Sequence, residues 1–423
     1  MLRQDEKTKI MAYDKFIPYS LPLIEDEDIA AVLDTLRSGW ITTGPKTKEF
    51  ETEFAKYIGC KHAIAVNSCT AALHLALDAI GIKEGDEVIT SPMTFAATAE
   101  VIRYFKAKPV FVDIDPLTMN IDVKEIERYL STIDNHQSSQ PKAIIPVHYT
   151  GYPCDMDSIR TLAGKYGLKV IEDAAHALPA YFKGKIVGST GDITCFSFYA
   201  TKNITTGEGG MVTTNNVEWA ERMRIMSLHG ISKDAWNRYS AEGSWYYEII
   251  APGYKYNLTD IAASLGIVQI GKADRLWMRR YDIARMYNES FQDIKEIELP
   301  FNDEDMTTVF QTPNLVNSKH SNPHTRHSWH LYVIRLNLEG LTIDRSRFIE
   351  ELKAMGIGTS VHFIPLHLHP YYRDTYGYKP EDFPVAYETF KRIISLPIYP
   401  KMTDGDVERV VEAVVSVIKK FRR

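Results

Sequence analysis

The residue with the clearest chemical potential is Lys202. It lies in YATKNITTGEGG (199–210), where hydroxyl side chains surround it and a glycine-rich turn follows. A lysine next to apolar strand ends loses hydration, which lowers its pKa and makes the neutral amine a nucleophile. A P-loop is excluded, because that motif places its glycines before the lysine. An ordinary surface lysine beside a turn is the alternative interpretation.

A carboxylate lies at the end of an apolar run elsewhere in the chain. The apolar run KVIED (169–173) ends in Asp173, and His176 follows three residues later. Asp173 could pair with a protonated ring nitrogen or with a metal ion, but a helix cap or a buried ion pair would use the same residue. His176 could face the same ligand or be a hydrogen-bonded core histidine.

A helix start that could bind phosphate follows the apolar run HAIAV (62–66). The predicted helix opens with small and polar residues, namely Ser68, Cys69, Thr70 and Ala71. Hydroxyl residues cap helices at such positions, and the free backbone N–H groups of a helix start can hold an anion. A plain helix cap explains the same residues.

All three segments follow predicted β-strands of one α/β sheet. Short β-rich runs alternate with helix-length segments between residues 60 and 215, which is typical of βαβ units and of a sheet covered on both faces. In such sheets ligands bind beyond the carboxyl ends of the strands. The last two of the predicted strands are close enough in sequence to be antiparallel. The strands are HAIAV (62–66), EVIT (87–90), PVFVDI (109–114), AIIPV (143–147), KVIED (169–173), ITCFSF (193–198) and GMVTT (210–214).

The pattern changes in the C-terminal third of the chain. Residues 259–292 read as one or two long amphipathic helices. Beyond them we expect a strand (327–336), a helix (345–356), a second strand IGTSVHF (357–363) and a closing helix (404–421), with an exposed loop or hairpin tip at 317–328. This predicts a large domain over residues 1–275, with an N-terminal arm at 1–25, and a small α+β domain over 276–423.

Composition limits the kind of protein this can be. The 423 residues include 49 Lys and Arg against 55 Asp and Glu, a net charge of −6, which argues against nucleic acid as the main partner. Hydrophobic residues make up 44% and charged residues 25%, which is ordinary globular usage. The first fifteen residues are too charged for a signal peptide, and no run of 18 apolar residues occurs. We expect a soluble, cytoplasmic protein without membrane partners.

Cysteines and histidines do not predict a metal site. The four cysteines are far apart and form no C-x-x-C pair, which argues against a disulfide framework and a structural zinc. Histidines gather in two stretches, His362, His367 and His369 in one and His320, His324, His327 and His330 in the other. No carboxylate or cysteine recurs nearby at a suitable spacing, so polar groups lining an entrance or a loop are the preferred interpretation.

A phosphate site, a carboxylate and a nucleophilic lysine together are what pyridoxal 5′-phosphate requires. The sequence also resembles the sugar aminotransferases of the DegT/DnrJ/EryC1/StrS family, which are fold type I pyridoxal-phosphate enzymes. The resemblance runs over nearly the whole chain, and its motifs occur in the family's order. They are SGWITTGPKTKEFETEFAKYIG, VNSCTAALHLAL, SPMTFAATAEVI, VFVDID, VIEDAAHA, FSFYATKNITTGEGGM, GYKYNLTDIAASLG and GTSVHFIPLH.

The resemblance implies roles for individual residues. The fold would be α/β, with a mostly parallel seven-stranded sheet and a smaller α+β C-terminal domain. Lys202 would bond to the cofactor aldehyde and then shuttle a proton, and Asp173 would hold the charge of the pyridine nitrogen. Phe95, otherwise a core residue by type, would stack on the ring, and His176 would lie near its hydroxyl. The phosphate would be bound by Ser68, Cys69, Thr70, Ala71 and Ser197. Cys69 departs from the glycine of many relatives.

The resemblance also implies a homodimer with a shared active site. In the family a segment matching GYKYNLTD (253–260) reaches the partner's phosphate. Many relatives have GYNYR there, whereas this chain has Lys255 and Asn257, and which of the two binds phosphate stays open. Substrate would contact residues of the N-terminal arm, the first turn and the small domain. They are Tyr19, Trp40, Ile41, Thr42, His330, Tyr332 and His362; the aromatic ones could equally be buried core residues.

The implied activity moves an amino group, with L-glutamate as donor and pyridoxamine 5′-phosphate as the aminated cofactor. The acceptor would be a UDP- or dTDP-linked 4-keto sugar, in amino-sugar biosynthesis for a surface polysaccharide or glycan. A 3-keto sugar aminotransferase and a sugar dehydratase are alternatives within the family, although dehydratases carry a histidine at the position of Lys202. A non-catalytic regulator is a third alternative. An NAD-dependent oxidoreductase is disfavoured, because no G-x-G-x-x-G follows any strand. No arginine is clearly dedicated to the donor carboxylate.

Overall fold

The computed structural model describes residues 16–133, 141–232, 246–300 and 325–423. Its centre is a seven-stranded sheet in the order β1-β9-β8-β5-β4-β2-β3. The strands are β1 (His62–Val66), β2 (Glu87–Thr90), β3 (Lys108–Phe111), β4 (Pro141–Ile145), β5 (Lys169–Asp173), β8 (Ile193–Ser197) and β9 (Gly210–Thr214). All seven match predicted strands, with differences of one to three residues at some ends.

One strand of this sheet runs against the others. The neighbours from β3 to β8 are parallel, whereas β9 is antiparallel both to β8 and to β1. The predicted antiparallel pairing of the last two strands is confirmed. Because β1 therefore points the same way as β5 and β8, the segments that follow these three strands emerge at one edge of the sheet.

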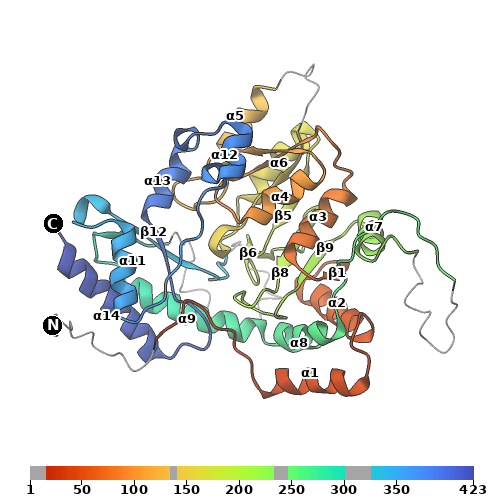
Figure 1. The fold of residues 1–423 in the computed structure, drawn as a ribbon, viewed down its shortest axis with the longest axis horizontal. Helices are drawn as coiled ribbons and strands as arrows, with labels where there is room; N and C mark the ends of the chain where they lie inside the picture. Colours follow the sequence, from red (N-terminus) through yellow and green to blue (C-terminus); the bar gives the residue numbers. More distant parts are fainter. Residues whose placement is uncertain (1–15, 134–140, 233–245, 301–324) are drawn as a thin grey trace, which may run out of the picture.

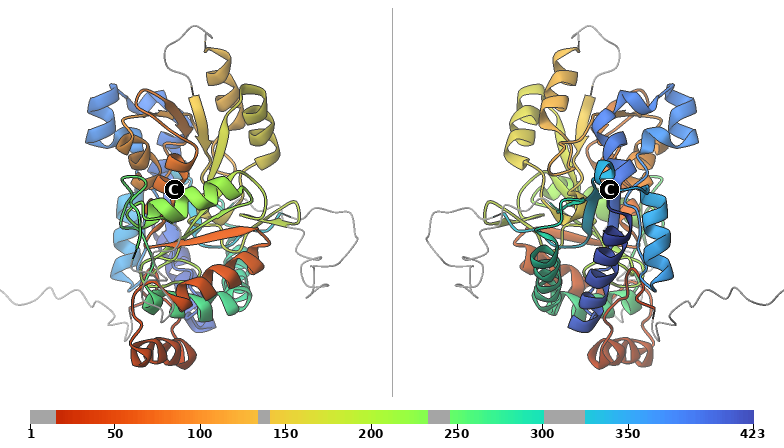
Figure 2. Two further views of the ribbon diagram at one scale, coloured as in Figure 1. Left: turned by 90° about the vertical axis from the view of Figure 1, so that its right-hand side faces the viewer. Right: turned by 90° about the vertical axis from the view of Figure 1, so that its left-hand side faces the viewer.

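Helices cover both faces of the sheet (Figure 2). One face packs against α3 (Cys69–Ala79), α4 (Ala96–Tyr104) and α7 (Val217–Ser227). The other packs against α2 (Pro45–Ile58) and α8 (Asp260–Gly271) near β1, and against α5 (Val123–Ser131) and α6 (Met156–Tyr166) near β3. Burial on both faces explains why the strands read as nearly continuous apolar runs.

The C-terminal part has its own sheet and core. An antiparallel sheet of β10 (Ile297–Glu298), β11 (Tyr332–Leu336) and β12 (Ile393–Leu396) packs with α9 (Ala273–Phe291), α11 (Arg345–Ala354) and α14 (Asp404–Phe421). In Figure 1 this part lies at the left, and α8 and α9 run below both parts, with α1 (Asp26–Ser38) outside α8. The other elements are β6 (Tyr181–Phe182), β7 (Lys185–Ile186), α12 (Pro370–Tyr376), α13 (Pro384–Arg392) and the 3-10 turns 149–151, 338–340, 366–368 and 380–382.

Two details of the C-terminal prediction differ from the structure. The predicted strand IGTSVHF is wrong, because Ile357 bridges to Ile17 while Ser360 bridges to Ser395, so the segment has no single partner strand with which to form a ladder. The strand predicted at 327–336 is shorter in the structure, because β11 covers only Tyr332–Leu336. The long helical stretch, predicted as one or two helices, is two helices that meet at Lys272. The predicted loop 317–328 lies mostly outside the described residues.

No helix within the described ranges is long and apolar enough to cross a membrane. All four cysteines are free.

Candidate active site

The site is built where β1, β5 and β8 end. Ser68, Asp173 and Lys202 lie in or directly after these ends, and Gly210 begins β9 at the same edge. Strand pairing holds the parts together, because Gly210 lies opposite both Val66 and Ser197. Residues that are far apart in sequence are thereby placed at one edge of the sheet.

Lys202 is held in a tight loop. Its backbone N–H donates to the carbonyl of Tyr199 at 2.9 Å, and the next residue, Asn203, donates through its amide to the carbonyl of Ser328 at 2.8 Å. Burial lowers the pKa of Lys202 to about 8; Arg280 acts in the same direction, and Asp173 opposes it. About a tenth of the amine is therefore uncharged and nucleophilic at pH 7, and about half at pH ~8.

Asp173 is almost completely buried at the end of β5. Its Oδ2 accepts a hydrogen bond from Thr98 Oγ1 at 2.8 Å, and its Oδ1 accepts one from the backbone N–H of Ala175 at 3.1 Å. Burial raises the pKa of Asp173, while these two hydrogen bonds and Lys202 oppose the rise. A buried carboxylate without a directly bonded cation is a favourable partner for a protonated ring nitrogen.

Two histidines stand beside Lys202. The rings of His176 and His330 have centroids 4.4 Å apart, and His330 Nδ1 lies 3.1 Å from Asn203 Oδ1. The buried Nδ1 of His176 has no hydrogen-bond partner among the residues that the structure describes. Burial, reinforced by the charge of Lys202, holds the pKa of both histidines well below the usual range, so both rings are neutral at physiological pH.

Aromatic rings form one wall of the site. Phe95, the N-cap residue of α4, is 63% exposed, which overturns the interpretation of Phe95 as a core residue. Its ring centroid lies 6.0 Å from that of Phe363, whose ring in turn stacks on His176 at 5.9 Å. An exposed phenylalanine at the sheet edge is free to pack against a planar ligand.

The start of α3 offers backbone N–H groups that can bind an anion. Ser68 Oγ caps the helix by accepting from the N–H of Ala71 at 3.0 Å. Because the helix begins at Cys69, the N–H groups of Cys69 and Thr70 have no carbonyl one turn earlier in the helix and are available to an anion. Gly210 faces this turn so closely that a Cβ on it would lie 2.6 Å from the carbonyl carbon of Ser68.

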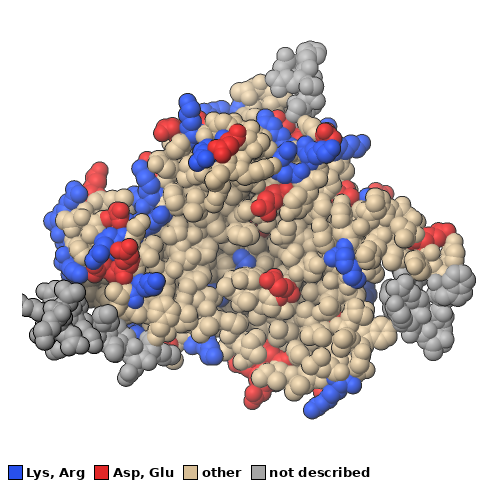
Figure 3. Space-filling model, in the orientation of Figure 1, with Lys and Arg blue, Asp and Glu red and all other residues tan. Residues whose placement is uncertain are grey.

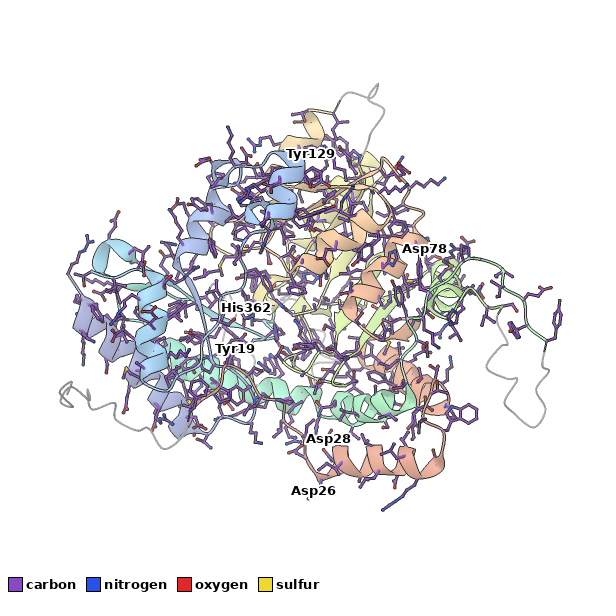
Figure 4. The ribbon with its side chains drawn as sticks, in the orientation of Figure 1. Tyr19, Asp26, Asp28, Asp78, Tyr129 and His362 are labelled. Atoms are coloured by element: carbon purple, nitrogen blue, oxygen red, sulfur yellow. The ribbon has the colours of Figure 1, made fainter. Side chains whose placement is uncertain are left out.

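Tyr19 and His362 meet at the boundary between the two parts of the chain. Their ring centroids are 5.3 Å apart, and Figure 4 shows the label of His362 just above that of Tyr19, left of the centre of the molecule. His362 Nδ1 lies 2.8 Å from Ser395 Oγ, and burial lowers its pKa to about 4. Figure 3 shows a hollow in this region, with mostly uncharged walls and charged residues gathered around the rim.

The other predicted substrate residues lie elsewhere. Trp40 Nε1 donates to the carbonyl of Thr43 at 3.2 Å in the turn before α2, where Ile41 and Thr42 are exposed. Tyr332 is in the core of the C-terminal part, and its hydroxyl donates to Asn288 Oδ1 at 2.7 Å. No contact in the described structure brings Tyr332 or this turn to Lys202.

Asn257 is held by its own chain. It forms a bridge with Val66, and its Nδ2 lies 2.5 Å from Thr43 Oγ1. The preceding residues bind the loop before Ser68, since the N–H of Asn67 donates to the carbonyl of Tyr256 at 2.8 Å. Lys255 is exposed.

Sequence reasoning missed two residues of this region. Thr98 reads as an ordinary helix residue, although its position next to the predicted ring-stacking Phe95 was a usable signal. Arg280 lies in α9 and is only 2% exposed; it donates to the carbonyls of Trp329, His330 and Ile398, and no carboxylate among the described residues pairs with it. Nothing local distinguishes Arg280 from other arginines of an amphipathic helix.

Metal ligands do not gather in this structure. Within the described ranges, no group of three or more histidine, cysteine, aspartate or glutamate side chains is placed to hold a metal ion. His320 and His324 lie outside the described residues.

A comparison with known families decides the class of the protein. The sequence model of the DegT/DnrJ/EryC1/StrS aminotransferase family matches residues 22–415. The chain belongs to this family. As a member it is a sugar aminotransferase that depends on pyridoxal 5′-phosphate, with the fold type I architecture expected from the sequence.

Individual relatives of this DegT-family aminotransferase cover nearly its whole length. It is 56% identical over 412 residues to the uncharacterized protein MJ1066 of Methanocaldococcus jannaschii, covering 97% of this chain and 100% of that one. It is 50% identical over 405 residues to the spore coat polysaccharide biosynthesis protein SpsC of Bacillus subtilis, covering 96% and 97%. Among solved structures, Spr1654 of Streptococcus pneumoniae, assigned as a sugar aminotransferase, superposes with a TM-score of 0.82 at 36% identity, covering 96% and 99%. Spr1654 has been solved in its PMP and PLP forms.

The residues at the sheet edge fit this cofactor. The amine with the lowered pKa suits the cofactor aldehyde, and the buried carboxylate suits the ring nitrogen. The exposed aromatic ring suits the face of the cofactor ring, and the start of α3 suits the phosphate. The unpartnered Nδ1 of His176 is a further buried polar atom that a ligand can satisfy. Gly210 approaches Ser68 closely, and because it has no Cβ, the start of α3 is not blocked by a side chain.

Proposed function

We propose that this aminotransferase moves an amino group from L-glutamate to a nucleotide-linked keto sugar, with a UDP- or dTDP-linked 4-keto sugar as the best candidate. The product would serve the synthesis of a surface polysaccharide or glycan. The observation that carries the proposal is that two groups lie at the same sheet edge. They are Lys202, whose pKa is lowered, and the buried carboxylate of Asp173. The printed function of SpsC, a spore coat polysaccharide biosynthesis protein, supports the choice of pathway class.

Lys202 is proposed as the reactive amine. Bound pyridoxal phosphate supplies an aldehyde that accepts amino groups and a ring that withdraws electrons from the reacting carbon. Lys202 would hold the cofactor through Nζ and would take up or release a proton at the same atom. Its lowered pKa suits this exchange, because an amine that titrates near the working pH both takes up and releases protons readily.

Asp173 and the phosphate site are proposed to fix the cofactor. Asp173 keeps the ring nitrogen protonated, which maintains the ring as an electron acceptor. The phosphate is bound by Ser197 and by the start of α3, where Ser68, Cys69, Thr70 and Ala71 lie. Phe95 packs on one face of the ring, and the neutral His176 lies near the ring hydroxyl.

Substrate is proposed to enter between the two parts of the chain. Tyr19, His330 and His362 surround the approach to Lys202, and their rings offer packing surfaces to a sugar. Tyr332 does not belong to this group, because its side chain is buried and engaged with Asn288. The turn of Trp40, Ile41 and Thr42 lies beside the segment of Asn257, so we assign it to a site shared with a partner subunit.

We propose a homodimer in which this segment of one chain reaches the phosphate of the other. The support is an apolar surface that a lone chain would leave in water: Tyr246, Ile249 and Ile250, just before GYKYN, are 61%, 67% and 56% exposed. A second apolar face on α1 consists of Ile29, Leu33 and Leu36, which are 43–50% exposed. Exposed apolar patches of this kind mark protein interfaces.

The proposed domain division, 1–275 and 276–423, places the boundary near the start of α9. Four free cysteines are consistent with the proposed cytoplasmic location.

The substrate proposal is tested by incubating the cofactor-loaded enzyme with glutamate labelled with ¹⁵N and a panel of 3-keto and 4-keto nucleotide sugars. Mass spectrometry should find the label in an aminated 4-keto sugar. Label in 3-amino products alone would overturn the position, and loss of hydroxyl without amination would indicate a dehydratase. Transfer from other amino acids but not from glutamate would overturn the donor.

A further inference from the structure

A chain of two buried hydroxyl groups leads to Asp173. Thr94 and Thr98 are 1% and 0% exposed, and their Oγ1 atoms lie 2.7 Å apart. Thr98 Oγ1 donates its proton to Asp173 Oδ2 at 2.8 Å. Because this proton is committed to the carboxylate, Thr98 accepts the proton of Thr94, and both hydrogen bonds point toward Asp173.

These bonds matter because Asp173 is buried. Its burial favours the neutral carboxylic acid, whereas hydrogen bonds from Thr98 and from the backbone of Ala175 favour the carboxylate. One donor on each oxygen also fixes the rotation of the carboxyl group. The hydroxyl of Thr98 therefore acts on both the charge and the direction of Asp173.

The same stretch of chain carries the aromatic wall. Phe95 is the N-cap of α4 and directly follows Thr94, and Thr98 lies one turn further along the helix. The ring contact of Phe95 with Phe363 and the hydroxyl contact of Thr98 with Asp173 thus belong to one rigid helix start. A shift of α4 would move the ring wall and the carboxylate contact together.

We propose that Thr98, supported by Thr94, is a positioning residue that keeps Asp173 ionised and directed at the ring nitrogen of the cofactor. The inference rests on the proposed role of Asp173 in that contact. Thr98 does not touch the reacting atoms, so its effect has to reach the cofactor through the carboxylate.

The test compares Thr98→Val, which removes the hydroxyl, with Thr98→Ser, which keeps it. A protonated ring nitrogen lowers the pKa of the other protonatable group of the bound cofactor, so loss of this proton raises the midpoint of the pH titration of its visible absorbance. We expect Thr98→Val to raise this midpoint by about one pH unit. Cofactor dissociation should become about tenfold faster and kcat/KM about tenfold lower, the size of one hydrogen bond to a charged group. Thr98→Ser should restore all three values.

Thr90→Val is the matched control. Thr90 is also 0% exposed, but its Oγ1 donates to the carbonyl of Ile145 at 2.8 Å and not to Asp173. This variant should leave the absorbance titration unchanged. Thr94→Val, which leaves the contact of Thr98 with Asp173 in place, should shift the midpoint in the same direction by a smaller amount, and it serves if Thr98→Val does not fold.

The results distinguish the proposed role of Thr98 from the proposed role of Asp173. Wild-type titration and cofactor release in Thr98→Val, or equal changes in Thr90→Val, would overturn the role of Thr98. Asp173→Asn provides the second comparison. If this variant keeps the wild-type absorbance titration, the proposed role of Asp173 fails as well; if it changes the titration while Thr98→Val does not, only the role of Thr98 fails.

Discussion

At the scale of single residues, the decisive property is the pKa of Lys202. An ordinary lysine titrates near pH 10.4, whereas burial lowers the pKa of Lys202 to about 8. The neutral amine attacks the aldehyde of free cofactor, so incorporation into cofactor-free protein should speed up about tenfold per pH unit below pH ~8 and level off above it. Stopped-flow absorbance measures this rate. A rate that keeps rising to pH 10 would show an unperturbed lysine.

Burial of Asp173 makes the stability of the folded protein depend on pH. Burial raises its pKa in the folded protein, so the folded state loses stability as the pH rises through that raised value and the carboxylate becomes charged. In cofactor-free protein, Asp173→Asn should therefore raise Tm at neutral pH by roughly 1–2 °C, while transamination falls about a hundredfold or more. Calorimetry and a glutamate-dependent assay measure the two effects. A lower Tm together with retained activity would mean that Asp173 is structural.

Chemistry-bearing residues were predictable from the sequence to different degrees. The placement of Lys202 and Asp173 at one sheet edge could be predicted because each follows or ends a buried strand, where α/β sheets place their ligands. Thr98 and Arg280 could not be assigned, because their importance comes from contacts with residues distant in sequence. Tyr332 was misjudged for a related reason: a tyrosine in an apolar strand fits a pocket or a core equally well, and its bond to Asn288 decides for the core.

At the scale of elements, the proposed phosphate site depends on the approach of β9 to the start of α3. In Gly210→Ala the new Cβ would lie 2.6–2.8 Å from the backbone of Ser68 and Cys69, which forces strand and helix apart. We expect about tenfold weaker cofactor binding, a loss comparable to one charge-assisted hydrogen bond. Equilibrium dialysis measures the affinity.

Gly164→Ala is the control for this variant. Gly164 lies in α6, and a Cβ there would meet no atom within 4 Å. It should bind the cofactor as the wild type does. Equal affinity of Gly210→Ala and wild type would place the phosphate elsewhere.

The seven strands of the main sheet were predictable because burial on both faces gives each an apolar run. The same rule failed for IGTSVHF, because this segment forms two separate bridges, one from Ile357 to Ile17 and one from Ser360 to Ser395. Strand-like sequence shows that a segment is half-buried, but only the tertiary arrangement shows whether a partner strand lies alongside.

At the scale of the whole molecule, the exposed side chains of Tyr246, Ile249 and Ile250 predict self-association. Ile249→Glu combined with Ile250→Glu places two charges on the proposed dimer surface, so it should convert the dimer to a monomer and lower activity by at least about tenfold. Leu117→Glu, at a side chain that is 58% exposed and remote in sequence, is the control. Light scattering measures the mass. A fully active monomer would exclude a shared site.

The central claim is that Lys202 carries the cofactor, and borohydride reduction tests it most directly. The reagent converts the bond between lysine and cofactor into a stable one, after which proteolysis and mass spectrometry locate the modified residue. The account predicts the cofactor mass on the peptide that contains Lys202 and no label after prior incubation with glutamate, which displaces the lysine. Label on a different lysine, or none in the cofactor-loaded protein, would contradict it.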